Sequence, residues 1–599
     1  MKCLSISAVL TVLGSVVANG AHIRPWELAL RTDLADGGCE LVPFSFRSAA
    51  QIHKDLINQN VVTQVTPVPV PRLGPKQNVV RVLSHDLHSL LSHVQLHCSN
   101  DVTSSLPLAG HSLPQVPLSR DDALSAHVLD VDLPRLELIP LITSGPAENR
   151  VDLAFFADGY TAGERQKFLD DASRLARDLV TNQTFFTVRP LLNIWVVFTP
   201  SKESGVGVGG KAKDTPFGLY RDGTELRGLY ANNSDVALAA CASLGDKCDY
   251  AILLGWDSIT CIGGEYTTTT ASLANGALVL RHEIGHSIIE VGEEYDGGFA
   301  YFGVNALHDP KNVTWAHWLT DLEDHLRVER SVMPMQAYPW TFLDVEKPWS
   351  FTFSSSGTYA RHLVKFSLSG IPRADDLLVS LDGVDLGWAP RKDIGIDRWH
   401  YDIFFEHALL EGEHVIEFAL RNRELQGQAQ LCSVEVLEYG SLGEFNASRG
   451  YYSLFPTYDQ DNGTSYRPTN GDCLMRTVAR PNFCNVCREG LWLSLLKRVD
   501  LIEDLRVTCP NPNSRVVSVD LVKLAQFREH PIEMTESYAI TWSRNGRILE
   551  ELANLAEVEL RDTDGTYRVD VTYAVEEVRL DPRGYLRASR TFDVTPHSC

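Results

Sequence analysis

The sequence predicts a multi-domain α+β protein, with β-sandwich modules at the N-terminus, inside and at the C-terminus of a domain that mixes strands and helices. Three observations support this fold class. The chain of 599 residues is long enough for several domains. Hydrophobic residues make up 44% and charged residues 22% of the chain, as in ordinary globular proteins. Strand-like apolar runs occur along the whole length, whereas amphipathic helical periodicity starts only after residue 150.

The N-terminus predicts secretion. Lys2 precedes an apolar run over residues 4–17, and small residues follow it, so residues 1–20 are expected to be a signal peptide. The run is too short to cross a bilayer, and no later apolar stretch reaches about 18 residues. The net charge of -23 argues against nucleic acid or an anionic membrane as a partner. We therefore expect a soluble, extracellular protein that binds neither.

Cysteines and glycosylation motifs agree with this compartment. Of the 12 cysteines, Cys3 lies in the expected signal peptide, and the remaining odd number leaves one that is free or paired elsewhere. Disulfides are the default for the others in an oxidising route. Cys484 and Cys487 have the spacing of a redox or structural-zinc pair, but without a matching second pair a disulfide anchor is favoured. The predicted N-glycosylation sites are Asn182, Asn232, Asn312, Asn446 and Asn462.

The mixed domain is expected to begin at residue 150. Residues 151–156, 191–198 and 250–255 are apolar runs typical of buried strands, and residues 162–181 have the periodicity of an amphipathic helix. This order predicts a sheet packed against helices. Residues 263–270 could add an edge strand to this sheet. An exposed edge could bind an extended peptide by strand addition. The alternative is an edge that is buried or has no binding role.

A His-Glu-x-x-His motif lies in an apolar run of this domain. On a helix, His282 and His286 are one turn apart on the same face, so both imidazoles can bind one ion. Glu283 is on the flank of that face, where its carboxylate can take a proton from a metal-bound water. The motif therefore predicts a Zn²⁺ hydrolase. The alternative is a coincidental histidine pair on a core helix.

The third protein ligand is expected just beyond the helix. Gly292 is expected to end the helix and turn the chain back, so that Glu293 or Glu294 can reach the zinc. Glu290 is a poorer candidate, because helix rise places it about 12 Å along the axis from His282. The alternative for the acid pair is a solvated helix end.

Three β-rich modules surround this domain. Residues 22–145 carry short apolar runs broken by proline, and residues 345–440 contain four strand-like segments. Residues 505–599 are predicted to form a C-terminal β-sandwich. A disulfide between Cys509 and Cys599 would join the two ends of this sandwich. The inserted module is either a carbohydrate- or protein-binding domain or an inert spacer, because fold does not determine function.

The chain resembles the IgA-peptidase family of secreted zinc metallopeptidases, in a form with an inserted module. The residues that carry the resemblance, besides His282 to Ser287, are Asp158-Gly159-Tyr160, Ser204-Gly205-Val206, Glu294-Tyr295, Tyr466-Arg467-Pro468, Cys473-Leu474-Met475 and Phe483-Cys484-Asn485-Val486-Cys487.

This resemblance implies a metzincin-like catalytic domain divided between residues 150–344 and 441–504. Met475 would be the methionine of the turn beneath the zinc. Residues 331–335 look superficially like such a turn but lack the flanking residues of the family. Glu293 stands where the family usually has Asp, which leaves the choice between Glu293 and Glu294 open.

The sequence thus predicts a secreted zinc endopeptidase that acts on a protein or peptide substrate. His282 and His286 would bind zinc with Glu293 or Glu294, and Glu283 would be the general base. Tyr295 and Tyr466 are candidates for stabilising the oxyanion. Two alternatives remain: a secreted binding protein with an inactive peptidase fold, and a zinc hydrolase of a non-peptide bond.

Overall fold

The computed structural model describes two compact units, residues 1–114 and 115–599. In the first unit it describes the backbone of seven short strands. In the second it describes residues 133–595 except 182–183, 222–227, 258–266, 299–300, 322–326, 460–462, 512–513 and 562–563. The first unit has an antiparallel sheet with the order β1-β4-β7-β6, in which β5 also pairs with β4, and a separate pair β2-β3. Its strands are β1 (Thr11–Val12), β2 (Val16–Ala18), β3 (Ala21–Ile23), β4 (Trp26–Arg31), β5 (Glu40–Leu41), β6 (Val61–Val68) and β7 (Gln77–Ser84).

The second unit begins with a five-stranded sheet of order β14-β13-β9-β10-β8. Neighbouring strands are parallel except for β8, which is antiparallel to β10. The three strands predicted from the apolar runs are confirmed as β9, β10 and β13. The bounds are β8 (Glu137–Ile142), β9 (Val151–Asp158), β10 (Leu192–Phe198), β13 (Tyr250–Gly255) and β14 (Thr267–Thr270). Because β8 pairs with β10, this sheet starts before residue 145, where we expected the N-terminal module to end.

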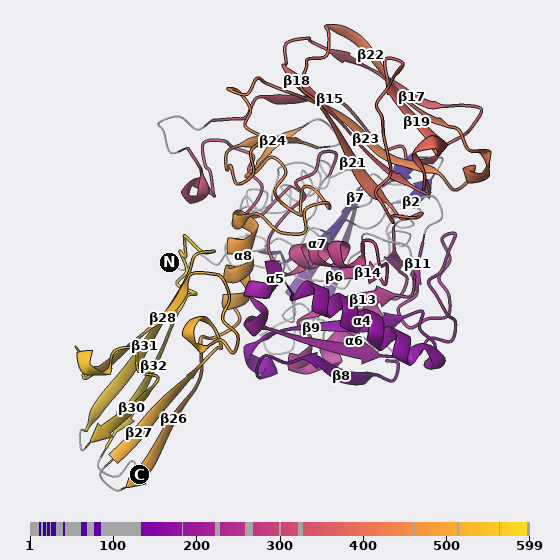
Figure 1. The fold of residues 1–599 in the computed structure, drawn as a ribbon. Helices are drawn as coiled ribbons and strands as arrows, with labels where there is room; N and C mark the ends of the chain where they lie inside the picture. The colour runs from indigo at the N-terminus through magenta and orange to yellow at the C-terminus, as the bar shows by residue number, and fades with distance from the viewer. Residues whose placement is uncertain are drawn as a thin grey trace. The chain divides into compact units, whose positions relative to one another are not determined.

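Helices cover both faces of the sheet, which explains why β9, β10 and β13 are apolar along their whole length. Leu153 and Phe155 of β9 share one core with helices α4, α7 and α8. Ala154 and Phe156, which point the other way, pack with α6. Figure 1 shows α4, α6 and α7 lying against this sheet. The helices are α4 (Arg165–Leu179), α5 (Thr184–Thr187), α6 (Ser234–Ser243), α7 (Gly276–Ile288) and α8 (Asn485–Leu496).

Asp158, at the end of β9, organises the loop over the carboxyl end of the sheet. Its carboxylate accepts hydrogen bonds from the backbone N–H groups of Phe217 and Leu219, both at 2.8 Å, and from Thr215 Oγ1 at 2.9 Å. Burial is the largest influence on this carboxyl, and it raises the pKa to about 6 despite these donors. The loop is thereby fixed next to β11 (Leu219–Tyr220) and its partner β12 (Tyr230–Ala231).

Residues 331–439 form a β-sandwich with its own core. One sheet has the order β15-β23-β18-β21, with β16 also on β23, and the other has the order β17-β22-β19-β20. The bounds are β15 (Ser331–Ala337), β16 (Thr341–Phe342), β17 (Trp349–Ser355), β18 (Arg361–Ser369), β19 (Leu377–Leu381), β20 (Val384–Asp385), β21 (Trp399–Phe405), β22 (Gly412–Leu420) and β23 (Gln430–Tyr439). Since β15 pairs with β23, the module begins before residue 345, its expected start.

After this module the chain returns to the mixed domain. A hairpin of β24 (Phe455–Tyr458) and β25 (Thr464–Arg467) precedes α8, whose residues share a core with α7. A second sandwich follows, with sheets β26-β27-β30 and β29-β28-β31-β32. Its strands are β26 (Ile502–Asn511), β27 (Ser514–Leu521), β28 (Glu536–Arg544), β29 (Arg547–Ile548), β30 (Glu557–Arg561), β31 (Gly565–Val575) and β32 (Arg587–Val594). Cys509 is disulfide-bonded, but its expected partner Cys599 lies outside the described residues.

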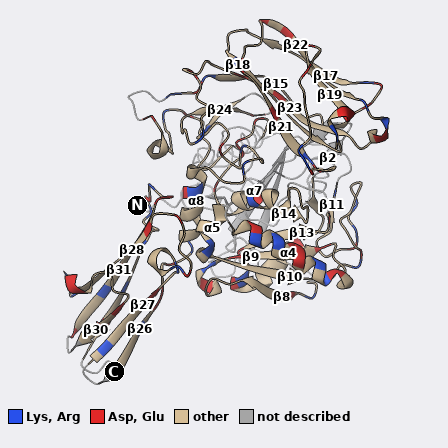
Figure 2. Ribbon diagram, in the orientation of Figure 1, with Lys and Arg blue, Asp and Glu red and all other residues tan. Residues whose placement is uncertain are grey.

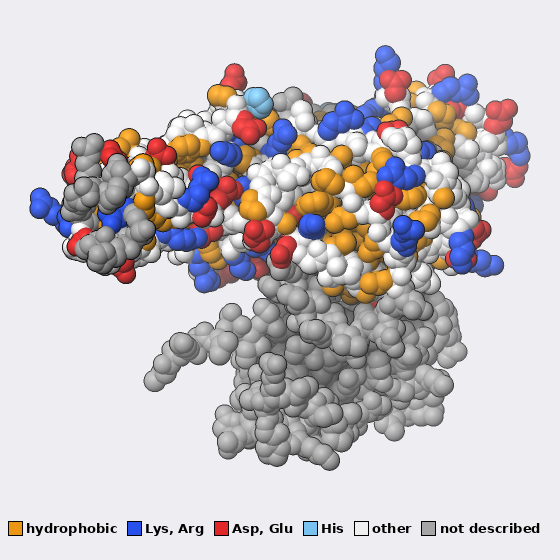
Figure 3. Space-filling view, turned by 90° about the horizontal axis from the view of Figure 1, so that it is seen from below, with side chains coloured by type: hydrophobic (Ala, Val, Ile, Leu, Met, Phe, Trp, Pro, Cys, Tyr) orange, Lys and Arg blue, Asp and Glu red, His pale blue; other side chains and the backbone are white. Residues whose placement is uncertain are grey.

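The surface of the described part is mixed in character. Positions of Lys and Arg occur among positions of Asp and Glu along the ribbon of α4 and of both sandwiches in spite of the negative net charge (Figure 2). Apolar side chains are interspersed with both signs of charge on the face shown in Figure 3. Within the described residues, none of the helices has the length and apolar character needed to cross a bilayer.

Candidate metal centre

Helix α7 carries both histidines of the motif and is buried around most of its circumference. Asp178 of α4 pairs with Arg281, which ties α7 to its neighbour. Gly285 lies between the histidines and allows close packing: a Cβ there would be 2.8 Å from Cζ of Phe483 and 3.5 Å from Sδ of Met475. This close packing of α7 against Phe483 and Met475 therefore requires a glycine at position 285.

Three side chains converge at the C-terminal half of α7. The Nε2 atoms of His282 and His286 are 3.2 Å apart. Glu293 Oε2 lies 3.2 Å from His282 Nε2, and Glu293 Oε1 lies 3.2 Å from His286 Nε2. A tetrahedral zinc with bonds of about 2.0–2.1 Å separates its ligand atoms by about 3.3 Å. The spacing of these three side chains thus fits one zinc ion.

The second nitrogen of each imidazole is engaged by the backbone. His282 Nδ1 lies 3.3 Å from the carbonyl oxygen of Leu474, and His286 Nδ1 lies 2.9 Å from that of Val291. A carbonyl can only accept, so each Nδ1–H donates, and Nε2 is the ring atom of each histidine that is left to bind a metal. This arrangement is common among metal-binding histidines, because it fixes both the tautomer and the ring orientation.

The charges in the cluster match a cation site. Burial favours neutral His286, but the Glu293 carboxylate outweighs it and the pKa of His286 rises to about 9. Burial likewise opposes ionised Glu293, but the two imidazoles hold its pKa well below the usual range. Glu293 Oε2 is also buried, and His282 Nε2 lies 3.2 Å from it. A largely buried carboxylate beside two buried imidazoles is a fitting ligand set for a divalent cation.

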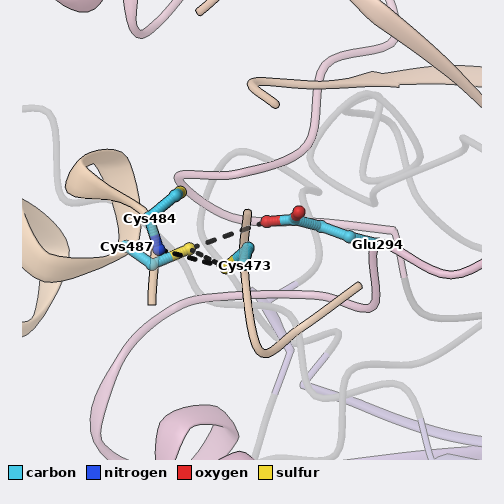
Figure 4. A group of neighbouring side chains, drawn as sticks. All are labelled: Glu294, Cys473, Cys484 and Cys487. Atoms are coloured by element: carbon cyan, nitrogen blue, oxygen red, sulfur yellow. Dashed lines mark hydrogen bonds between the residues drawn. The ribbon is translucent and has the colours of Figure 1, made fainter. Parts of the chain in front are cut away.

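Glu294 points away from this cluster, although it neighbours Glu293. Its side chain is 1% exposed and lies with Cys473, Cys484 and Cys487, as Figure 4 shows. Successive side chains of a non-helical, extended segment point to opposite sides, so only one of the two acids can face the histidines. The structure brings Glu293 together with His282 and His286 and leaves Glu294 out. Glu290 is exposed.

The segment that carries Glu293 does not leave the helix as expected. Helix α7 ends at Ile288, so the expected helix end at Gly292 is wrong. Asn305 holds the following segment: its Oδ1 accepts from Gly292 N at 3.0 Å, and its Nδ2 donates to Gly292 O at 3.0 Å and to Glu294 Oε1 at 2.9 Å. No sequence signal identified Asn305, because its partners are brought to it only by the fold.

Glu283 lies beside the cluster but outside the group of three. It is 5% exposed, and burial is the main reason that its pKa is raised, with Glu293 adding to the effect and the two imidazoles opposing it. A carboxylate of raised basicity next to a metal site can accept a proton from a bound water. Its position on the flank of the histidine face stays a prediction from the spacing of the motif.

Met475 lies in a turn beneath α7. The turn is closed by the carbonyl of Cys473, which accepts from Arg476 N and Thr477 N, both at 3.0 Å. Met475 is fully buried, and its carbonyl accepts from Glu294 N at 3.0 Å. Met333 and Met335, the rival pair, lie in strand β15 rather than in a turn.

The two tyrosine candidates differ in their surroundings. Tyr295 interacts with Glu293, which together with the larger effect of burial raises the pKa of Tyr295 well above its usual value. Tyr466 packs against the core, and its backbone pairs with Leu307. Strand β14, at one edge of its sheet, is buried at all four residues; residues 263–266 of the predicted edge strand lie outside the described part.

The disulfide expected between Cys484 and Cys487 is absent from the described residues. Cys241 and Cys248 form a disulfide, whereas Cys484 and Cys487 are free and buried, so the predicted disulfide anchor is wrong.

Comparison with known families confirms the resemblance. Residues 139–334 match the family model described as IgA Peptidase M64, which makes the chain similar to peptidases over the segment that holds α7 and Glu293. Among curated proteins there is no match. Among solved structures, a β-glucosidase from Kluyveromyces marxianus in complex with glucose is 10% identical over 44% of this chain and 47% of that chain, with a TM-score of 0.13. The match thus spans about half of that enzyme, and a TM-score this low carries no argument about fold or function.

Proposed function

We propose that this protein is a secreted zinc-dependent endopeptidase whose metal ligands are His282, His286 and Glu293. The observation that carries the proposal is the convergence of two imidazole nitrogens and one carboxylate at mutual distances of 3.2 Å. The match of residues 139–334 to a peptidase family supports peptide bonds as the substrate.

Each residue of the site has a separate task in this proposal. When bound, zinc polarises the scissile carbonyl and lowers the pKa of a bound water. Glu283 accepts the proton of the attacking water and later delivers it to the leaving amine. Leu474 and Val291 hold the imidazoles through their carbonyl groups, so the histidines need not reorient during the reaction.

The test compares three proteins expressed as the full chain. Glu283→Gln keeps the size of the side chain but cannot act as a base, so cleavage of a mixed protein substrate should fall at least about 100-fold while zinc content stays unchanged. Glu290→Gln, at an exposed position nearby, is the control and should cleave like the wild type. A chelator should abolish cleavage by the wild type.

Two results would decide against the proposal. Equal cleavage by Glu283→Gln and wild type, with zinc present in both, would remove Glu283 from the mechanism. If the zinc-loaded wild type cleaved no protein substrate, the inactive binding protein or the hydrolase of a non-peptide bond would become the better interpretation.

Secretion is supported by the N-terminal apolar run and by the disulfide between Cys241 and Cys248. Expression in a secreting host should deliver the protein to the medium with a new N-terminus near residue 20. Retention of the intact chain inside the cells would contradict this part of the proposal.

A further inference from the structure

A second cluster of side chains that can bind a metal is joined to the first through the neighbouring residues Glu293 and Glu294. Cys473, Cys484, Cys487 and Glu294 come from three separate segments of the chain, and their ligand atoms all lie within 4.8 Å of one another. All four residues are buried, with exposures of 3% or less. Figure 4 shows the carboxylate of Glu294 directed at the sulfur atoms. The proposed peptidase mechanism does not use any of the four.

The distances agree with zinc coordination. The Sγ atoms of Cys473 and Cys487 are 3.7 Å apart, and Cys487 Sγ is 3.7 Å from Glu294 Oε1. A tetrahedral zinc with Zn–S bonds of about 2.3 Å and a Zn–O bond of about 2.1 Å separates two sulfurs by about 3.8 Å and a sulfur from an oxygen by about 3.6 Å. A disulfide would instead require about 2.05 Å between sulfurs.

The immediate surroundings of Cys484 favour a thiolate. Cys484 is the N-cap of α8, and the backbone N–H groups of Val486 and Cys487 are directed at its sulfur. The N–H of Cys484 itself donates to Cys473 Sγ at 3.4 Å. Free N–H groups at a helix N-terminus stabilise a negative sulfur. A Cys-x-x-Cys pair in this position is a common half of a structural zinc site.

An unsatisfied oxygen supplies a second, independent observation. Glu294 Oε2 is buried and has no hydrogen-bond partner among the described residues. A buried carboxylate oxygen without a donor is costly unless a cation binds it. The buried guanidinium of Arg467 acts on Glu294 electrostatically and offsets part of the negative charge that three thiolates and a carboxylate would bring.

We propose that Cys473, Cys484, Cys487 and Glu294 bind a structural Zn²⁺ ion, distinct from the ion at the histidines. Four protein ligands fill a tetrahedral shell and leave no position for water, so this ion has no catalytic role. It fixes two elements of the neighbouring site: Glu294, which is adjacent to Glu293, and the turn that starts at Cys473. That turn presents the Leu474 carbonyl to His282.

Metal counting on the secreted full chain tests the proposal. The wild type should bind two zinc ions per chain, and His286→Ala and Cys487→Ser should each bind one. Cys432→Ser is the matched control: Cys432 is another free, buried cysteine, but it lies in strand β23 of the inserted sandwich, so the variant should keep both ions.

Cobalt substitution identifies which ion is lost. Cobalt bound by cysteine sulfur gives a charge-transfer absorption that a site of histidine and carboxylate lacks. This band should be present in the wild type and in His286→Ala and absent from Cys487→Ser. If Cys487→Ser does not fold, the band in His286→Ala still decides the matter.

Two results would overturn the second site. One is a single zinc in the wild type that His286→Ala removes completely. The other is a disulfide among Cys473, Cys484 and Cys487 found by peptide mapping of the alkylated protein. Neither result would contradict the proposed peptidase function. That function would fail separately if a protein that gives the sulfur–cobalt band showed no zinc-dependent cleavage.

Discussion

Asn305 should be one of the most sensitive positions for stability, although its three side-chain hydrogen bonds go to Gly292 and Glu294 and not to the histidines or Glu293. It is fully buried and makes three hydrogen bonds, two with the backbone of Gly292 and one with Glu294. Asn305→Ala leaves Gly292 N, Gly292 O and Glu294 Oε1 without this partner. At about 1–3 kcal/mol for each buried unsatisfied group, and with partial relaxation, the free energy of unfolding should fall by about 3–6 kcal/mol.

Asn305→Asp separates the loss of hydrogen bonds from the loss of volume. The new carboxylate can still accept from Gly292 N, but it loses both donated hydrogen bonds and faces the carboxylate of Glu294. Urea unfolding should therefore show a loss of about 2–4 kcal/mol, and zinc affinity should fall about 10–100-fold, as for other residues that orient metal ligands. Gln166→Ala is the control, because Gln166 is an exposed amide with a hydrogen bond to Asp170, and it should change stability by less than about 0.5 kcal/mol. A loss below about 1 kcal/mol in both Asn305 variants, with wild-type zinc affinity, would refute the claim that Asn305 holds Glu293 in place.

Three further changes test other parts of the structure. Gly285→Ala should lower the free energy of unfolding by about 1–3 kcal/mol in a thermal or urea melt, because the new Cβ would lie 2.8 Å from Phe483; an unchanged or higher stability would show that Phe483 moves freely. Glu293→Gln should lose the zinc that Glu294→Gln retains at the histidines, as measured by metal content after dialysis, and the reverse order would exchange the roles of the two acids. Asp158 has a pKa of about 6 in the folded state against an ordinary 3.8, so the folded protein binds this proton more readily than the unfolded chain. From neutral pH down to about pH 4, the free energy of unfolding of the wild type should therefore rise by up to about 3 kcal/mol relative to Asp158→Asn, and a pH-independent difference between the two would contradict this.

The local part of the site follows from the sequence. The spacing of His282 and His286 is sufficient to place both on one helical face, because four residues make about one turn. The flanking apolar residues make that helix a buried one. The central strands are similarly evident, since continuous apolar runs are needed wherever helices cover both faces of a sheet.

The boundaries of the modules were predicted less well, because strand pairing is a long-range property. Strand β8 resembles its neighbours in the sequence, yet it pairs with β10 across the intervening helix α4. Strand β15 likewise pairs with β23 at the far end of the inserted sandwich. Local patterning indicates that such segments are strands but not to which sheet they belong.

The choice between Glu293 and Glu294 depends on where the helix ends, and the sequence pattern misplaced that end. Gly292 is a plausible helix terminator, but α7 already ends at Ile288. Asn305 then holds the next residues in a non-helical segment through hydrogen bonds that only the fold can bring about. In such a segment neighbouring side chains diverge, so one acid reaches the histidines and the other reaches the cysteines. A shift of one residue would place Glu294 at the histidines and Tyr295, which has no carboxylate, at the cysteines. Because the two clusters lie so close together, the backbone between Glu293 and Glu294 must be held rigidly. Asn305 holds it through hydrogen bonds to Gly292 and Glu294, and in our proposal the structural zinc holds it through Glu294.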